Sequence, residues 1–150
     1  METIEQHISH FITRQTVASV ACSDNDGHLI CFNCYYAYDE EQQLLVFKTS
    51  DNSLHMQYLR ERPQLAGTIL PDKLNKLKVR GLQFTGQLLY NGESLAKNVS
   101  KLYYRRFPFA MAMEGNVYAI RLDRLKMTDN TLGFGTKLVW DRVQSTVSLV

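Results

Sequence analysis

The run of residues that most strongly suggests chemistry is a cluster of hydroxyl, amide and basic side chains. It reads Lys48-Thr49-Ser50-Asp51-Asn52-Ser53 and precedes a helical pattern. A phosphate needs several hydrogen-bond donors and positive potential in a small volume, and a helix N-terminus with hydroxyls and a lysine offers both. The same residue types are also the usual helix caps, and Asp51 would repel an anion. The segment therefore predicts either a phosphate site or an ordinary helix start.

A second candidate has the look of a metal-ligand spacing, His28-x-x-Cys31-x-x-Cys34. Zinc sites with two nearby cysteines use a tight turn to aim both sulfurs at one point. The alternating pattern here indicates a strand, on which residues three apart face opposite sides. His28 and Cys34 would share a face that Cys31 does not. We therefore predict no metal site, and cysteines that are buried and structural.

Three further features leave their alternatives open. Tyr103-Tyr104-Arg105-Arg106-Phe107-Pro108 could stack on bases and bind phosphates, or could be a helix end with favourable arginines. Trp140 is the one tryptophan, and it belongs to the core, to a flat ligand's pocket or to a subunit interface. Gly133-Phe134-Gly135 lacks the strand-to-helix context of a dinucleotide fingerprint and predicts a turn.

A set of short elements must position these residues. Apolar spacing and capping residues predict helices over residues 2–14, 54–62 and 93–106. Alternation predicts strands over residues 16–22, 28–38, 44–49, 64–70, 76–90, 116–127 and 136–141. So many strands, mostly joined by short turns, favour an antiparallel barrel with peripheral helices over a doubly wound parallel sheet.

Two details of these strands are testable. In the second strand, alternate residues share one face: Ile30, Phe32, Cys34, Tyr36 and Tyr38. In the long strand 76–90, Gly81 and Gly86 predict a bulge, a bend or a close approach of a ligand.

Length and composition describe an ordinary globular protein. A chain of 150 residues is the size of one domain, and 45% hydrophobic with 21% charged residues fits neither a disordered nor a fibrous protein. No apolar run approaches a membrane helix, and the N-terminus lacks a signal-peptide layout. Three cysteines argue for a reducing compartment. We expect a soluble, cytoplasmic, single-domain protein with no membrane partner.

The charge is unevenly distributed along the chain. Residues 1–75 hold 5 Lys and Arg against 10 Asp and Glu, whereas residues 76–150 hold 12 against 5. The basic residues alternate with apolar ones instead of forming runs, so solvated faces or a positive site for a small phosphorylated ligand explain them. We do not expect a nucleic acid partner.

Several segments together resemble a known superfamily. The strand and helix start Phe47-Lys48-Thr49-Ser50-x-x-Ser53-x-His55 and the strand residues 80–86 resemble the pyridoxamine 5′-phosphate oxidase-like FMN-binding split barrels. Residues 104–108 and 128–135 resemble a narrower group within it, the small bacterial YhbP-type proteins. The similarity covers essentially the whole chain.

The resemblance implies a homodimer of six-stranded antiparallel split barrels with FMN at the subunit interface. It places the FMN phosphate and ribityl chain against Lys48, Thr49, Ser50, Ser53 and His55. It lays the isoalloxazine ring along Asn33, Cys34, Tyr35 and Tyr36. It has Gln83 hydrogen-bonding the flavin or its ribityl chain, and Trp140 contacting the ring from the partner subunit.

The sequence indicates the reaction less closely than it indicates the fold and the cofactor site. The chain has no counterpart of the C-terminal Arg/His motif of pyridoxamine phosphate oxidases, so we do not expect that activity. The expected function is a flavin-dependent oxidoreductase whose substrate and catalytic residues are unknown. The alternative is a non-catalytic module of the same fold that holds a flavin or haem.

Overall fold

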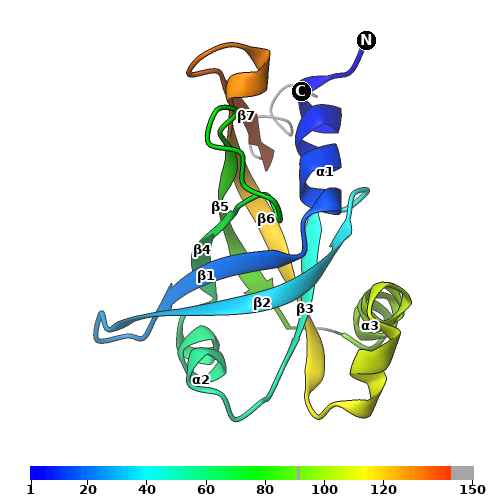
Figure 1. The fold of residues 1–150 in the computed structure, drawn as a ribbon. Coiled ribbons are helices and arrows are strands. Elements are labelled where there is room, and N and C mark those ends of the chain that lie inside the picture. The colour runs from blue at the N-terminus through cyan, green and yellow to red at the C-terminus, as the bar shows by residue number, and fades with distance from the viewer. Residues whose placement is uncertain (91, 143–150) are drawn as a thin grey trace, which may run out of the picture.

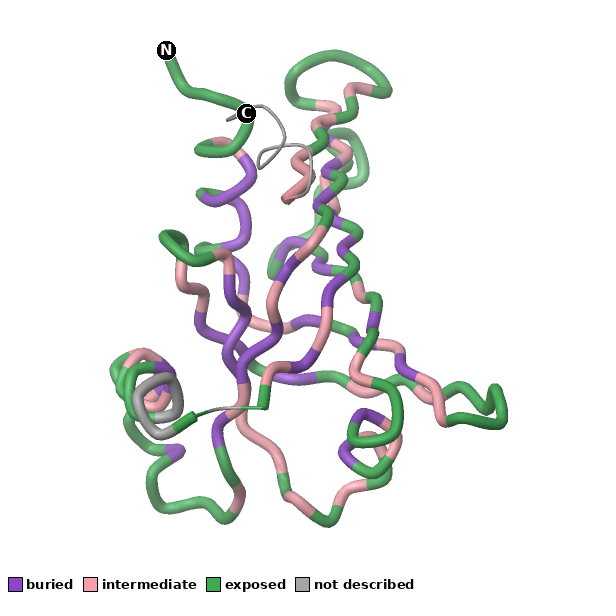
Figure 2. Tube along the Cα trace, turned by 180° about the vertical axis from the view of Figure 1, so that it is seen from behind, coloured by how far each residue is buried: buried purple, intermediate pink, exposed green. Residues whose placement is uncertain are grey.

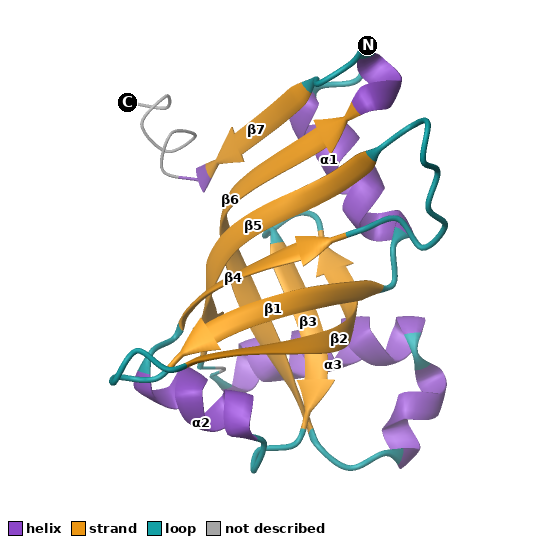
Figure 3. Cartoon of the chain, turned by 60° about the vertical axis from the view of Figure 1, so that its left-hand side comes forward, coloured by secondary structure: helices purple, strands orange, loops and turns teal. Residues whose placement is uncertain are grey.

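The computed structural model describes residues 1–90 and 92–142 and builds them around one antiparallel sheet. The sheet has seven strands in the order β3-β2-β1-β4-β5-β6-β7 (Figure 1). A further pairing of β3 with β6 closes six of these strands into a barrel, and β7 extends the far half of β6 (Figure 3). The predicted fold class, a six-stranded antiparallel split barrel, is confirmed. The strands are β1 Val17–Ser23, β2 Leu29–Asp39, β3 Leu44–Thr49, β4 Gln64–Ile69, β5 Arg80–Leu89, β6 Asn116–Asp129 and β7 Lys137–Asp141.

The barrel interior is the main hydrophobic core, and β2 shows how the sequence fills it. Cys34 and Tyr36 are buried, and Ile30, Phe32 and Tyr38 pack against the same core. The predicted inward face of this strand is therefore confirmed. The intervening residues of β2 face outward, which is the consequence of the two-residue period of a strand.

Two helices close the barrel at opposite ends (Figure 1). Helix α1, Ile4–Arg14, begins at a capping box and buries Ile8, Phe11 and Ile12. The Tyr36 hydroxyl donates to the Ile12 carbonyl at 2.6 Å, which joins this helix to the barrel interior. Helix α2, Leu54–Glu61, buries Met56 and Leu59 at the other end.

A second apolar cluster lies outside the barrel, where helix α3, Glu93–Arg106, and the short 3-10 helix η1, Pro108–Ala112, cover β3 and β6. Arg106 fixes this cover to the barrel: its guanidinium donates to the carbonyls of Tyr36 at 2.8 Å and Gln15 at 2.6 Å. Of the two roles that the sequence left open for Arg106, contact with a nucleic acid or a place at a helix end, the structure therefore shows the one at a helix end. Another 3-10 helix, η2 (Asn130–Leu132), follows β6.

The expected strand over residues 76–90 is wrong at its start, because β5 begins at Arg80. Leu77 is 93% exposed, so the alternation of residues 76–79 has no layer against which to bury an apolar face. The predicted irregularity at Gly86 is confirmed by a register shift between Thr85 and Gly86. A side chain at Gly86 would put its Cβ 2.2 Å from the Arg121 carbonyl oxygen, so only glycine fits.

Candidate functional site

The outer face of the sheet carries a row of polar side chains that crosses five strands. Asn33, Ser19, Thr68, Gln83 and Lys126 are successive register partners on β2, β1, β4, β5 and β6. All five are exposed. Ser19 donates its hydroxyl to the Asn33 amide oxygen at 2.6 Å. We call these residues the polar row; they offer amide, hydroxyl and ammonium groups along one line.

A second row runs beside the polar row and is smaller and more apolar at its centre. It consists of Cys31, Ala21, Ala66, Thr85 and Arg124, again in register. Both rows contribute to the lining of a cavity of about 440 Å³ on the outer face. We call this cavity the groove. It has small side chains in the middle and basic side chains, Arg124 and Lys126, along its β6 edge.

The groove continues toward one end of the barrel. A hollow of about 430 Å³ shares Ser19 and Thr68 with it and reaches Leu70, Pro71 and Asp72. The Asp72 carboxylate accepts from the main-chain N–H of Thr16 at 2.9 Å and from its hydroxyl at 2.6 Å. That carboxylate therefore ties the start of the β4–β5 loop to the residue before β1.

The junction between β3 and α2 lies where β2 and β3 part. The pairing of β2 with β3 ends at Tyr36 and Phe47. Beyond it, the His55 ring stacks on Phe32 with centroids 3.8 Å apart. Its Nε2 lies 2.7 Å from the Thr49 hydroxyl. Burial lowers the pKa of His55, so the ring is neutral near pH 7 and brings no positive charge to the junction.

Other junction side chains also find partners within the chain. Ser53 is the N-cap of α2 and accepts from the Met56 N–H at 3.4 Å, whereas Ser50 accepts from the Asn52 N–H at 3.3 Å. Lys48 donates to the carbonyls of Ala110 at 2.7 Å and Met113 at 2.6 Å. Lysine at 48 therefore holds the segment after η1 against β3.

Asp51 keeps a negative charge at this junction. Its carboxylate accepts from the hydroxyl of Tyr118 and from the side-chain amide of Asn116, the latter at 2.7 Å. The hydrogen bond from Tyr118, followed by that from Asn116, lowers the pKa of Asp51. Arg60 donates to the Asp51 main-chain oxygen at 2.6 Å and places a positive charge nearby.

The structure divides the sequence-predicted site residues among the β3–α2 junction, the outer face of the sheet and the barrel core. Lys48, Thr49, Ser50, Ser53 and His55 form the β3–α2 junction, and Asn33 and Gln83 share the polar row. Tyr35 is exposed on the same face of β2, with its ring 5.7 Å from Phe107. The remaining three have inward or internal contacts: Cys34 and Tyr36 in the core, and Trp140, which packs against the core beneath Arg142.

The cysteines do not all behave as predicted. Cys22 and Cys34 are buried, and burial raises the pKa of Cys22 and raises that of Cys34 to about 12. The expectation that Cys31 is buried is wrong, because it occupies an outward position of β2 and lines the groove. The chain therefore has one accessible thiol, located in the groove.

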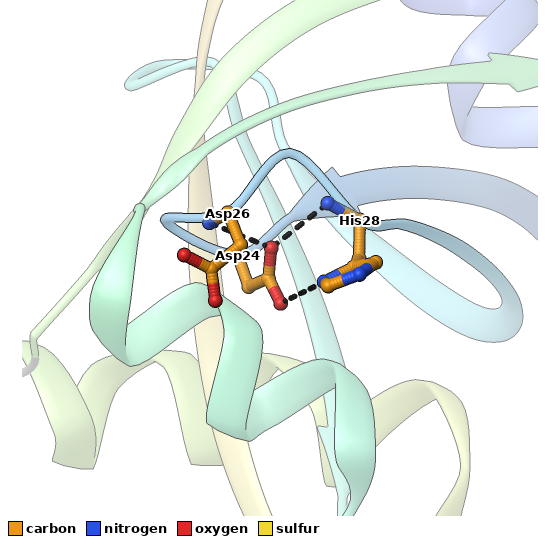
Figure 4. Close-up of side chains that lie close together, drawn as sticks. All are labelled: Asp24, Asp26 and His28. Carbon is orange, nitrogen blue, oxygen red and sulfur yellow. Dashed lines mark hydrogen bonds and ion pairs between the residues drawn. The ribbon is translucent and has the colours of Figure 1, made fainter.

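A compact group of possible metal ligands occupies the β1–β2 turn, where Asp24, Asp26 and His28 lie together (Figure 4). Hydrogen bonds of the turn account for this arrangement. The Asp24 carboxylate accepts from the main-chain N–H groups of Asp26 at 3.0 Å and His28 at 2.8 Å, and lies 2.8 Å from His28 Nδ1.

Sequence reasoning missed Ser19, Thr68, Arg124 and Lys126. Each lies at an outward position of a strand, a signal that is readable from alternation alone. Their alignment depends on strand order and register, which alternation does not fix. No helix among residues 1–90 and 92–142 has the length and apolarity needed to cross a membrane.

Solved structures share this fold at low sequence identity. They include a heme binding protein from Mycobacterium smegmatis, with a TM-score of 0.77 and 14% identity over 94% of this chain and 59% of that one. A FAD-binding protein from Mesorhizobium loti matches with a TM-score of 0.67 and 12% identity, over 81% of this chain and 91% of that one. HutZ, a heme storage protein from Vibrio cholerae, matches with a TM-score of 0.59 and 15% identity, over 81% and 89%. The chain thus has the split-barrel fold that these proteins share.

Closer relatives identify the family. A UPF0306 protein from Serratia proteamaculans is 34% identical over 92% of this chain and 95% of its own length. The UPF0306 protein YhbP from Escherichia coli O127:H6 is 36% identical over 95% of this chain and 100% of its own. No protein-family model matches the chain. The chain belongs to the UPF0306 family, which confirms the resemblance to the YhbP-type proteins.

Proposed function

We propose that this chain binds FMN, with the isoalloxazine ring laid on the groove and the phosphate at the N-terminus of α2. The observation that carries the proposal is the polar row. Three interstrand steps separate Asn33 from Gln83, roughly 14 Å, which is a span suited to an extended flat ligand.

The residues of the groove fit the two edges of a flavin ring. One edge of that ring carries amide-type donors and acceptors, and Thr68 and Gln83 in the groove, with Asn33 at the end of the polar row, offer matching groups. The other edge is apolar, and Ala21 and Ala66 provide small apolar surface beside the row. Flat apolar walls with a few placed polar groups are typical of cofactor sites.

The β3–α2 junction fits the phosphate end. Phe32, which His55 stacks upon on the inner side of β2, directly precedes Asn33, so the backbone of β2 brings the junction within one residue of the end of the polar row. The first N–H groups of a helix have no partner within the helix and favour an anion. Tyr118 and Asn116 bind the Asp51 carboxylate, and Arg60 offsets part of its charge.

The proposed reaction class is oxidoreduction of a substrate that the residues do not specify. FMN supplies hydride and electron transfer when bound, and the chain's own residues would bind and orient the ring. Tyr36 is a poor proton donor, because its hydroxyl is buried and donates to Ile12, and burial raises its pKa. His55 is neutral and faces Thr49, so we assign it a positioning role.

We further propose that a second copy of the chain covers the groove. The groove is open on the outer side of the sheet, and its small side chains would let another surface approach closely. The acidic first half and basic second half of the sequence would complement each other across a two-fold axis.

One observation favours a second candidate, in which the module holds haem. Cys31 places an accessible thiol in the groove, and a cysteine thiolate is one of the axial ligands that haem iron takes. Structures with this fold include heme-binding proteins. A haem module would bind without turning over reduced nicotinamides.

The two candidates separate in one titration. We expect the purified chain to quench free FMN fluorescence and to shift the flavin absorbance, and Gln83→Leu to weaken this binding at least about tenfold. Gln57→Leu, an exposed glutamine on α2, is the matched control. A Soret band on adding haem that Cys31→Ser abolishes, together with no response to FMN, would replace the first candidate by the second.

A further inference from the structure

One end of the barrel exposes several large apolar side chains. The β4–β5 loop exposes Leu74 to 72% and Leu77 to 93%, and the β6–β7 connection exposes Phe134 to 99%. The tube in Figure 2 shows both segments mostly exposed. Apolar side chains gathered in this way mark an interaction surface more often than isolated ones do.

The two loops form one surface, because one leads into β5 and the other follows β6, and these two strands are neighbours in the sheet. The N–H of Asn130 donates to the Val79 carbonyl at 2.9 Å, and Arg80 pairs with Asp129 where β5 and β6 meet. Both loops project from the same end of the barrel (Figure 1). We call Leu74, Leu77 and Phe134 with their basic neighbours the loop patch.

The charge of the loop patch is positive. Lys73, Lys76 and Lys78 alternate with the exposed leucines, and all three are exposed. The acidic residue of the β4–β5 loop is Asp72, whose carboxylate is bound to Thr16. Residues 130–136 contain no acidic residue.

This combination selects among partners. Pairing the loop patch with itself across a two-fold axis would bring like charges together. A nucleic acid would neutralise the charge of the lysines but would leave the aliphatic side chains exposed to water. A phospholipid surface with anionic headgroups fits both the charge and the apolar side chains of the loop patch. The lysines are attracted to the headgroups, while leucine and phenylalanine enter the boundary between headgroups and acyl chains.

We propose that the loop patch docks the protein on an anionic phospholipid surface. The inference is independent of the proposed flavin function, and it revises the sequence expectation that no membrane is a partner. The groove and the loop patch use different residues, so a variant of one leaves the other intact.

Co-sedimentation with vesicles tests the proposal. We expect the full chain to bind vesicles of phosphatidylcholine with phosphatidylglycerol and not phosphatidylcholine alone, and added salt to weaken the binding. Leu77→Ser with Phe134→Ser should lower affinity at least about tenfold, since two large apolar side chains leave the interface. Lys76→Gln with Lys78→Gln should also weaken it.

Matched controls keep the result interpretable. Leu29→Ser removes an 81% exposed leucine in the β1–β2 hairpin, and Lys97→Gln removes an exposed lysine on α3; neither should change vesicle binding. Equal binding by Leu77→Ser/Phe134→Ser and the parent would overturn the proposal, as would no binding to anionic vesicles. Loss of dimerisation with vesicle binding retained in that variant would assign the apolar side chains to a second copy. A parent chain that binds a DNA duplex but no vesicles, with Lys76→Gln/Lys78→Gln abolishing the DNA binding, would assign the lysines to nucleic acid. Either result overturns the proposal.

Discussion

The groove and the β3–α2 junction are both rich in polar side chains, yet they differ in how those side chains are used. At the junction, Thr49, Ser53 and Asp51 are bound by groups of the same chain. Along the groove, Ser19 bonds to Asn33 at the end of the polar row, whereas Gln83 and Lys126 face solvent across the same row. Satisfied polar groups stabilise a fold, and exposed ones aligned on a hollow are available to a ligand.

Residue type alone does not distinguish a helix cap from a binding site. Serine and threonine occur in both regions. Their register and the partners they find decide which role each one has.

The largest effect should come from filling the groove. Ala66→Trp places an indole on an outward position between Ala21 and Thr85, where the core is untouched. We expect cofactor affinity to fall by about a hundredfold or more, since the flat ligand and the indole compete for one volume. Fluorescence titration with FMN measures it, and Leu77→Trp, at a 93% exposed position of the β4–β5 loop outside the groove, is the control. If the affinity for FMN is unchanged in Ala66→Trp, the isoalloxazine ring does not bind in the groove.

The next effect should come from charge at the junction. Ser53→Asp keeps a good N-cap but sets a carboxylate at the anion end of α2, so affinity for FMN should fall at least about tenfold. Ser53→Asn is the matched control, because it caps the helix without a charge. Equal affinity in both variants would mean that the phosphate lies elsewhere, with the basic residues at the β6 edge as the alternative.

His55→Ala should act mainly on stability. It removes the stack on Phe32 and the hydrogen bond to Thr49, and we expect the free energy of unfolding to fall by about 1 kcal/mol. Chemical denaturation measures the loss, with Gln57→Ala on the exposed face of α2 as the control. A variant as stable as the parent would show that the junction network contributes little to the fold.

The smallest effect concerns pH. His7 lies 2.7 Å from Asp129 and 3.0 Å from Glu2, and the hydrogen bond to Asp129 is the main cause that raises the pKa of His7 above 6.5. A raised histidine pKa adds stability below 6.5 that is lost as pH rises through the folded-state value. We therefore expect the melting temperature to fall slightly over that range, and His7→Gln to flatten the profile.

The same pH series separates stability from binding. Burial lowers the pKa of His55, so its ring does not gain charge over the range in which His7 loses it. Above about pH 7, where the FMN phosphate is already a dianion, FMN affinity should therefore stay constant while the melting temperature falls. Affinity that tracks the melting temperature would connect binding to the α1 end of the barrel instead of to the junction.

Much of the fold could be predicted because its signals are local. Alternation identified the inward face of β2, Ser53 and Pro63 bracketed α2, and Gly86 marked the bulge. Local alternation failed at Lys76 and Leu77, where no neighbouring layer exists to bury the apolar side chains. That failure concealed the loop patch, because a strand was expected where an exposed loop lies.

The site could be predicted only in part. Residues that lie close together in the sequence, such as Thr49 and Ser53, could be recognised as one candidate site without knowing the fold. The polar row unites residues from β1, β2, β4, β5 and β6, and only strand order and register bring them together. Cys31 was expected to be buried, although it lies between the inward residues Ile30 and Phe32 of β2 and the alternation therefore already placed it on the outer face.

The accessible cysteine allows the most direct test of where the cofactor binds. Cys22 and Cys34 are buried, so iodoacetamide should modify Cys31 first, and mass spectrometry identifies the modified residue. Our account predicts that saturating FMN slows alkylation of Cys31 at least about tenfold in the parent, and has no such effect in Ala66→Trp. Alkylation of Cys31 at the same rate with and without bound FMN would contradict the claim that the groove holds the ring.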